Sequence, residues 1–166
     1  DRFLYLSDTK AGKVYVWKGI PSADSEPEFV LDIPGAARLT SDGTWFAVAP
    51  MVNHEIRLYK VADLSANAKP SVVGRVGVFN LAPCAEVKDG HLFVADSGFN
   101  RVHVWRNVDD AVAGKPADVI LGSQDRRPRV SRNGMHYPAS VCFDGTYLWV
   151  GETKFSERLL RFSPAP

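Results

Sequence analysis

A long polar loop holds the residues with the clearest potential for chemistry. Residues 123–137 contain four arginines against a single acid, Asp125, and close on a histidine and a tyrosine. Guanidinium forks match the planar oxygens of phosphate and carboxylate groups, so we expect a basic lip that binds phosphate, carboxylate or a polyanionic sugar. The alternative is a solvated loop, or one that docks on another part of the protein. The candidate ligand-binding residues are Arg126, Arg127, Arg129, Arg132, His136 and Tyr137.

Acidic residues form a second candidate set, because they recur directly after apolar runs. Asp8, Asp96 and Glu152 occupy equivalent places. His54 lies in the corresponding turn of another run. Carboxylates and imidazoles bind divalent cations, so these four residues are the metal candidates, and a divalent cation is the cofactor to consider. A carboxylate in this place can instead accept backbone N–H groups of its own turn. Its repetition favours that structural role, and Arg101 is then expected to pair with an acid in a neighbouring repeat.

The elements that position both sets form an internal repeat of strand, polar turn and strand. The clearest copy runs from His91 to Trp105, and copies of the same pattern begin at Phe3, Trp45 and Tyr147. An aromatic residue closes each copy, and successive closing aromatics are 42, 46 and 57 residues apart. Four-stranded units at such a period are typical of β-propeller blades. The closing aromatics, which we expect to pack between blades, are Trp17, Tyr59, Trp105 and Phe162.

Flanking segments complete each unit as four strands, A to D. Strand A ends at Asp-Gly, which suits a tight turn because Gly adopts positive φ without a Cβ clash. Strand D follows a proline. The chain is therefore predicted to be all-β, a β-propeller segment of four-stranded antiparallel blades, about 3.5–4 in number. It would have fourteen strands, lacking the first A and the last D. The approximate repeat units of this single segment are 1–33, 34–75, 76–122 and 123–166.

The third copy resembles the NHL repeat. Its segment from Leu92 to Val102 is similar to the repeat consensus, and the segment from Pro116 to Gly122 resembles the stretch that joins repeats in bacterial NHL proteins. The second copy departs from the pattern at Pro50, where an acid is expected, and at His54-Glu55. The fourth departs by a longer turn and by Arg161 at an apolar position. The resemblance implies a propeller fold and not an activity.

NHL propellers resemble six-bladed rings, and three and a half blades do not close such a ring. An open arc exposes strand edges that tend to pair. The chain begins at Asp1 rather than Met, so we expect a longer or processed polypeptide. Its expected partner is therefore a missing N-terminal half of the propeller. The alternatives are a second copy that completes the ring, or closure as a small four-bladed ring.

Composition narrows the function classes without choosing an activity. The net charge of +1 argues against nucleic acid as a general partner, and no apolar stretch is long enough to span a membrane. Two cysteines, Cys84 and Cys142, are expected to be buried thiols. We expect a soluble, non-enzymatic scaffold that binds a protein or small molecule, with secreted and periplasmic locations both open. The alternatives are a metal-dependent lyase or lactonase-type propeller enzyme, and RNA or polyanion binding through loop 123–137.

Overall fold

The computed structural model describes residues 3–74, 78–122, 134–154 and 156–164. These residues form four antiparallel sheets, which we call blades 1 to 4 in chain order. The strands are β1 (Phe3–Asp8), β2 (Lys13–Lys18) and β3 (Phe29–Asp32) in blade 1; β4 (Ala36–Ser41), β5 (Trp45–Pro50), β6 (Ile56–Lys60) and β7 (Ser71–Val73) in blade 2; β8 (Cys84–Lys88), β9 (His91–Asp96), β10 (Arg101–Trp105) and β11 (Val119–Gly122) in blade 3; and β12 (Pro138–Phe143), β13 (Leu148–Glu152) and β14 (Leu159–Phe162) in blade 4.

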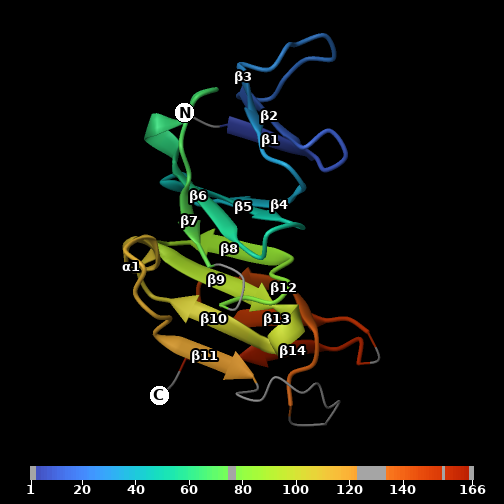
Figure 1. Cartoon of the computed structure of the whole chain (residues 1–166), viewed down its shortest axis with the longest axis vertical. Coiled ribbons are helices and arrows are strands. Elements are labelled where there is room, and N and C mark those ends of the chain that lie inside the picture. The colour runs from blue at the N-terminus through green and yellow to red at the C-terminus, as the bar shows by residue number, and fades with distance from the viewer. Residues whose placement is uncertain (1–2, 75–77, 123–133, 155, 165–166) are drawn as a thin grey trace.

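Blade 1 lies at one end of the long axis of the molecule and blade 2 follows it, and blades 3 and 4 lie side by side at the other end (Figure 1). Strands within each blade pair in chain order. Blade 1 lacks a strand before β1, and blade 4 lacks a strand after β14, within the described residues. The predicted all-β propeller architecture and its fourteen strands are confirmed. The sheets form an open arc of blades.

Three short helical segments in the described chain interrupt this pattern, and none was predicted. They are η1 (Val61–Asp63), η2 (Ser97–Phe99) and α1 (Val108–Val112). Helix α1 begins at Asn107, whose side chain caps it by accepting the N–H of Asp109. None of these helices is long and apolar enough to cross a membrane.

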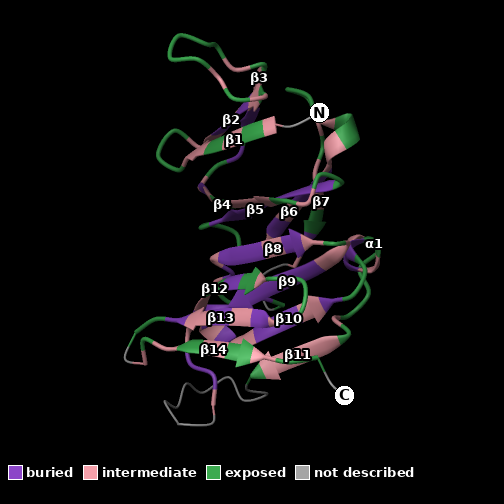
Figure 2. Ribbon diagram, turned by 180° about the vertical axis from the view of Figure 1, so that it is seen from behind, coloured by how far each residue is buried: buried purple, intermediate pink, exposed green. Residues whose placement is uncertain are grey.

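Consecutive blades pack face to face, and each interface encloses its own apolar cluster. Side chains alternate along a strand, so a central blade must be apolar on both faces. In β5, Trp45, Ala47 and Ala49 join the cluster shared with blade 3. Phe46 and Val48 join the cluster shared with blade 1. The continuous apolar runs of the sequence follow from this double burial, which Figure 2 shows as purple in the middle of the stack.

The closing aromatics lie at these interfaces, as expected, where a preceding blade is present. Tyr59 and Trp105 are buried, and Phe162 packs at the edge of the cluster between blades 3 and 4. Trp17 stays partly exposed because no described blade precedes β1. The expectation for the cysteines is half right: Cys84 is buried, whereas Cys142 is exposed. Cys142 lies on the outer side of blade 4, which no blade of the described chain covers.

Gly98, at the middle of η2, occupies a position that leaves no room for a side chain. Its N–H donates to the Asn80 carbonyl at 2.7 Å, and a Cβ at Gly98 would lie 1.9 Å from that same oxygen. We expect Gly98→Ala to lower the free energy of unfolding by about 3 kcal/mol, because the η2 turn must move away from residue 80. Urea unfolding measures the loss. Gly114→Ala is the control, because Gly114 has positive φ but open space around it, and should cost only about 1 kcal/mol. Equal losses in the two variants would contradict this tight contact.

Candidate functional site

Two residues of the candidate basic lip are described, and they lie near the point where β13 turns into β14. Arg126, Arg127, Arg129 and Arg132 lie outside the described residues. The two other predicted ligand-binding residues, His136 and Tyr137, come directly before β12, and His136 is buried. Glu152 ends β13 beside them.

Glu152 fastens the segment before β12 to the end of β13. Its Oε2 accepts the Nε–H of Arg158 at 2.7 Å, and its Oε1 accepts Nη2 of Arg158 at 3.1 Å and the backbone N–H of His136 at 2.6 Å. Arg158 also donates to the carbonyl of Gly134 at 2.8 Å. The pair therefore holds residues 134 and 136, where the arginine-rich loop returns to the blade. We call this arrangement of Glu152 and Arg158 the blade 4 clamp.

The clamp sets the protonation of Glu152. Burial raises the pKa of this carboxyl, but the Arg158 guanidinium and the His136 N–H together outweigh burial and hold the pKa below its ordinary value. Glu152 is therefore ionised at neutral pH, and its charge is neutralised locally by Arg158.

An exposed cation and a tyrosine stand next to the clamp. Lys154 donates from Nζ to the Tyr137 hydroxyl at 3.0 Å, and the same ammonium lies 4.1 Å from the centre of the Tyr137 ring. Tyr137 is held in a left-handed conformation, with φ of 49°, and its N–H donates to Oδ1 of Asn100 at 2.8 Å. The sequence reasoning missed Lys154. Its signal was present, because Thr153-Lys154 follows the acid of blade 4 as Thr9-Lys10 follows Asp8 in blade 1.

Blade 3 carries a related clamp built on Asp96. Oδ1 of Asp96 accepts the N–H of Asn80, which precedes β8, at 2.9 Å. Nε of Arg101 lies 3.4 Å from Oδ2, and Nε2 of His103 lies 3.5 Å from the same oxygen. The expectation that Arg101 pairs with a neighbouring blade is therefore wrong. Both charges belong to one hairpin, because the turn folds the start of β10 back over the end of β9.

The acids also differ in which backbone they bind. Asp8 accepts the N–H of Ala11 within its own turn, as expected. Asp96 and Glu152 instead accept from the segment that leads into the first strand of their own blade, at Asn80 and His136. Sequence spacing could not show this, because the donor lies 16 residues before its acceptor.

Blade 2 lacks both the acceptor and the donor of the clamp. Pro50 stands where Asp96 and Glu152 stand, and Pro34 stands where Asn80 and His136 donate their N–H groups. Proline has no N–H to donate, so the missing acceptor is matched by a missing donor. Two prolines that looked unrelated in the sequence thus remove the donor and the acceptor of the same hydrogen bond.

His54 has a structural partner in the next blade. Its Nδ1 accepts the N–H of Leu81 at 2.7 Å. Asn100 does the same one blade later, where it accepts the N–H of Tyr137. Both residues have positive φ, at 51° and 56°. His54 therefore fills the asparagine position of the repeat.

Hydroxyl groups join blades at the same loops. The residue after the acid donates its hydroxyl to the first residue of the first strand of the next blade: Thr9 to the Ala36 carbonyl at 2.7 Å, and Ser97 to the carbonyl of Pro138.

The four candidate metal ligands are engaged with arginine or with backbone groups. Among the described residues, no group of three or more His, Cys, Asp or Glu side chains is placed to hold a metal ion.

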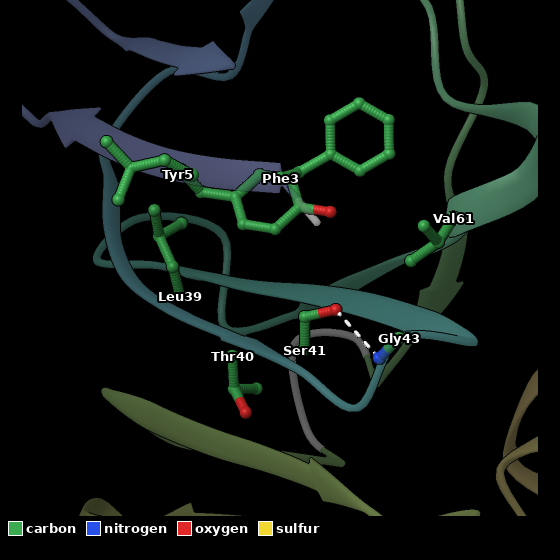
Figure 3. Close-up of a pocket in the computed structure, with 8 residues that line it drawn as sticks. Phe3, Tyr5, Leu39, Thr40, Ser41, Gly43 and Val61 are labelled. Carbon is green, nitrogen blue, oxygen red and sulfur yellow. Dashed lines mark hydrogen bonds between the residues drawn. The ribbon is translucent and has the colours of Figure 1, made fainter. Parts of the chain in front are cut away.

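Two cavities lie between consecutive blades, one beside the first strand and one beside the last. One, of about 460 Å³, lies between β1 and β4 and is lined by Phe3, Tyr5 and Leu39, with the Ser41 hydroxyl at its rim (Figure 3). The other, of about 560 Å³, lies between blades 3 and 4 beside β14, and its lining includes Phe93. Both are largely apolar surfaces next to the first and last strands.

Comparison with known proteins supports the fold and goes no further. No family model matches the chain, and no curated protein sequence matches it. BamB from Moraxella catarrhalis matches with a TM-score of 0.55 at 10% identity, over 92% of this chain and 38% of that one. Glutaminyl cyclase from Myxococcus xanthus matches with a TM-score of 0.56 at 14% identity, over 96% of this chain and 61% of that one. Both are β-propellers. The chain thus spans less than two thirds of the length of either structure, and the likeness shows the fold alone.

Removing the charge of Glu152 should destabilise the protein in a pH-dependent way. Because its pKa is lowered in the folded state, ionised Glu152 contributes its full stabilisation above its ordinary pKa of 4.5, and this contribution is lost below 4.5, as pH falls through the lower pKa of the folded protein. We expect Glu152→Gln to lower the free energy of unfolding by about 1–3 kcal/mol at pH 7, and by progressively less as pH falls below 4.5. Urea unfolding at pH 7 and at several pH values below 4.5 measures both the loss and its decline. A loss of the same size at all of them would contradict the charge-based clamp.

The same substitution at Glu86 should have the opposite sign. Glu86 lies on β8 and accepts the Phe143 N–H of β12 at 3.1 Å, and burial raises its pKa above the ordinary 4.5. A raised pKa in the folded state means that stability falls as pH rises from 4.5 through the higher pKa of Glu86 in the folded protein. Glu86→Gln keeps the hydrogen bond and should raise the melting temperature at pH 7, with the gain shrinking towards pH 4. A lower melting temperature at pH 7 would show that the Glu86 charge is stabilising.

Proposed function

We propose that this chain is part of an NHL-type propeller that works as a non-enzymatic binding scaffold and holds an anionic ligand at the lip of blade 4. The observation that carries the proposal is the exposed Lys154 ammonium on the Tyr137 ring, next to a carboxylate that Arg158 already neutralises. A rigid blade end with surplus positive charge and an aromatic ring suits a ligand that bears phosphate, carboxylate or sulfate groups.

The repeat motif supports the scaffold part of this proposal. The polar positions of copy three have structural partners: Asp96 binds the N–H of Asn80, and Asn100 binds the N–H of Tyr137. Arg101 completes the Asp96 pair. Residues that would otherwise be candidates for chemistry are used to hold loops, which favours binding over catalysis.

The charge balance supports an anionic ligand. The four arginines of loop 123–137 and Lys154 outnumber the two acids of the same segments that are not in the clamp, Asp125 and Glu157. The clamp fixes residues 134 and 136 at the base of this lip. The charge of these segments therefore favours a ligand with several anionic groups.

Heparin oligosaccharide binding tests the proposal with a matched pair of lysines. Replacing all four loop arginines with Ser should weaken binding and make its salt dependence shallower, with the slope falling by up to about one for each arginine that binds an anionic group. Lys154→Ala should reduce the salt slope by about one. Lys10→Ala is the control, because Lys10 holds the equivalent place in blade 1. The affinity for immobilised heparin oligosaccharide is measured by surface plasmon resonance at several NaCl concentrations.

Two outcomes of that experiment would overturn the proposal. Unchanged affinity and slope in the four-serine variant would remove the loop from any anion site. Equal losses for Lys154→Ala and Lys10→Ala would show diffuse attraction to a charged surface rather than a site on blade 4.

A further inference from the structure

Each blade has two different faces, and the three internal interfaces always join one kind to the other. We call the side towards the next blade the forward face and the side towards the preceding blade the backward face. Forward faces carry small residues at the end of their second strand, such as Ala49 in blade 2 and Ala95 in blade 3. Backward faces carry larger side chains, such as Leu92, Val94 and Trp105 in blade 3.

The backward face of blade 1 has the same apolar residue types, but no other blade covers it within the part of the chain that the structure describes. Leu4 and Leu6 are 42% and 53% exposed. The equivalent residues of blade 3, Leu92 and Val94, are fully buried against blade 2. Trp17 of blade 1 is likewise partly exposed, whereas its equivalents Tyr59 and Trp105 are buried. Blade 1 therefore presents a formed interface without its partner, visible as green on β1 in Figure 2.

The forward face of blade 4 is the complementary open surface. Gly151 takes the place of Ala95, and Leu159 takes the place of Val102. Leu159 is 67% exposed, whereas Val102 is fully buried. Cys142 and Trp149, paired across β12 and β13, lie on the same side of the blade.

We propose that the forward face of blade 4 packs on the backward face of blade 1 of a second copy of this chain. The internal interfaces supply the reason, because Leu92, Val94 and Trp105 of blade 3 pack on a forward face within the chain. Leu4, Leu6 and Trp17 of blade 1 present the same kinds of side chain at the equivalent places. The charges agree. The Arg161 guanidinium lies over the rings of Tyr147 and Trp149 on the forward face, so a contact between two forward faces would bring two arginines together. On the backward face of blade 1, Tyr15 and Trp17 offer aromatic rings for that cation.

Such a contact is heterologous, so copies associate head to tail. Two copies would bring eight sheets together, which is within the range of propeller rings. A closed ring of two copies buries both open faces of each chain, whereas a contact that does not close would grow into longer chains.

Sedimentation velocity with two charge substitutions tests this contact. Leu6→Glu places a carboxylate on the backward face of blade 1, and Leu159→Glu places one on the forward face of blade 4. Both side chains are more than half exposed, so neither change should disturb the fold of the single chain, which circular dichroism checks. We expect the unaltered chain to associate at about 100 µM, and each variant to dissociate at least tenfold more readily. Met51→Glu, in an exposed turn of blade 2, is the matched control and should associate as the unaltered chain does.

Mixing the two variants distinguishes head-to-tail contact from any symmetric one. The Leu6→Glu chain keeps an intact forward face, and the Leu159→Glu chain keeps an intact backward face. Their equimolar mixture should therefore form a one-to-one dimer that neither forms alone. A monomeric unaltered chain, association that neither variant weakens, or a mixture that stays monomeric would each overturn the proposal.

Thiol labelling gives a second readout on the same samples. Cys142 lies on the forward face and is exposed, whereas Cys84 is buried within the chain. Labelling of Cys142 should slow as protein concentration rises, and the Leu6→Glu variant should abolish that slowing. A labelling rate that does not depend on concentration while the chain is associated would place the contact elsewhere.

Discussion

Face-to-face packing of consecutive sheets is the interaction on which the rest of this structure depends. A three- or four-stranded sheet this small gains little stability by itself, and burial of each Leu, Val or Phe against a neighbour contributes about 1.5–3 kcal/mol. Blades 2 and 3 obtain this on both faces, and blades 1 and 4 on one. The same requirement explains the apolar runs and the interblade aromatics.

Packing alone does not fix how the loops meet, and the polar contacts at the strand ends do this. Asp96 and Glu152 hold the entry to their own blade, His54 and Asn100 hold the entry to the next, and Thr9 ties blade 1 to blade 2. These contacts engage the carboxylates and the imidazole with backbone or arginine. In the function proposed above, the ligand is instead bound by groups that the repeat contacts do not use, Lys154 and Tyr137 among them.

The fold could be predicted from the sequence because it repeats, and a repeat records strands, turns and period several times. The partners of single residues were harder, because they depend on the third dimension. Spacing placed Asp96 and Arg101 correctly but could not show that they meet in one hairpin. The correspondence of Pro34 and Pro50 becomes visible only once the donor and acceptor positions of the clamps in blades 3 and 4 are known. The exposure of Cys142 depends on the absence of a covering blade among the described residues. Lys154 could be found from the sequence by its match to Lys10, because each lysine follows an acid and a threonine.

Amide hydrogen exchange at low protein concentration tests the central role of blade packing most directly. Strands β2 and β10 are each paired on both edges, with β1 and β3 and with β9 and β11. They differ in that blade 3 is covered on both faces and blade 1 on one. The amides of β10 should exchange at least about tenfold more slowly than those of β2, since stability is then distributed by neighbour contacts. Equal protection of the two strands, or slower exchange in β2, would contradict the account.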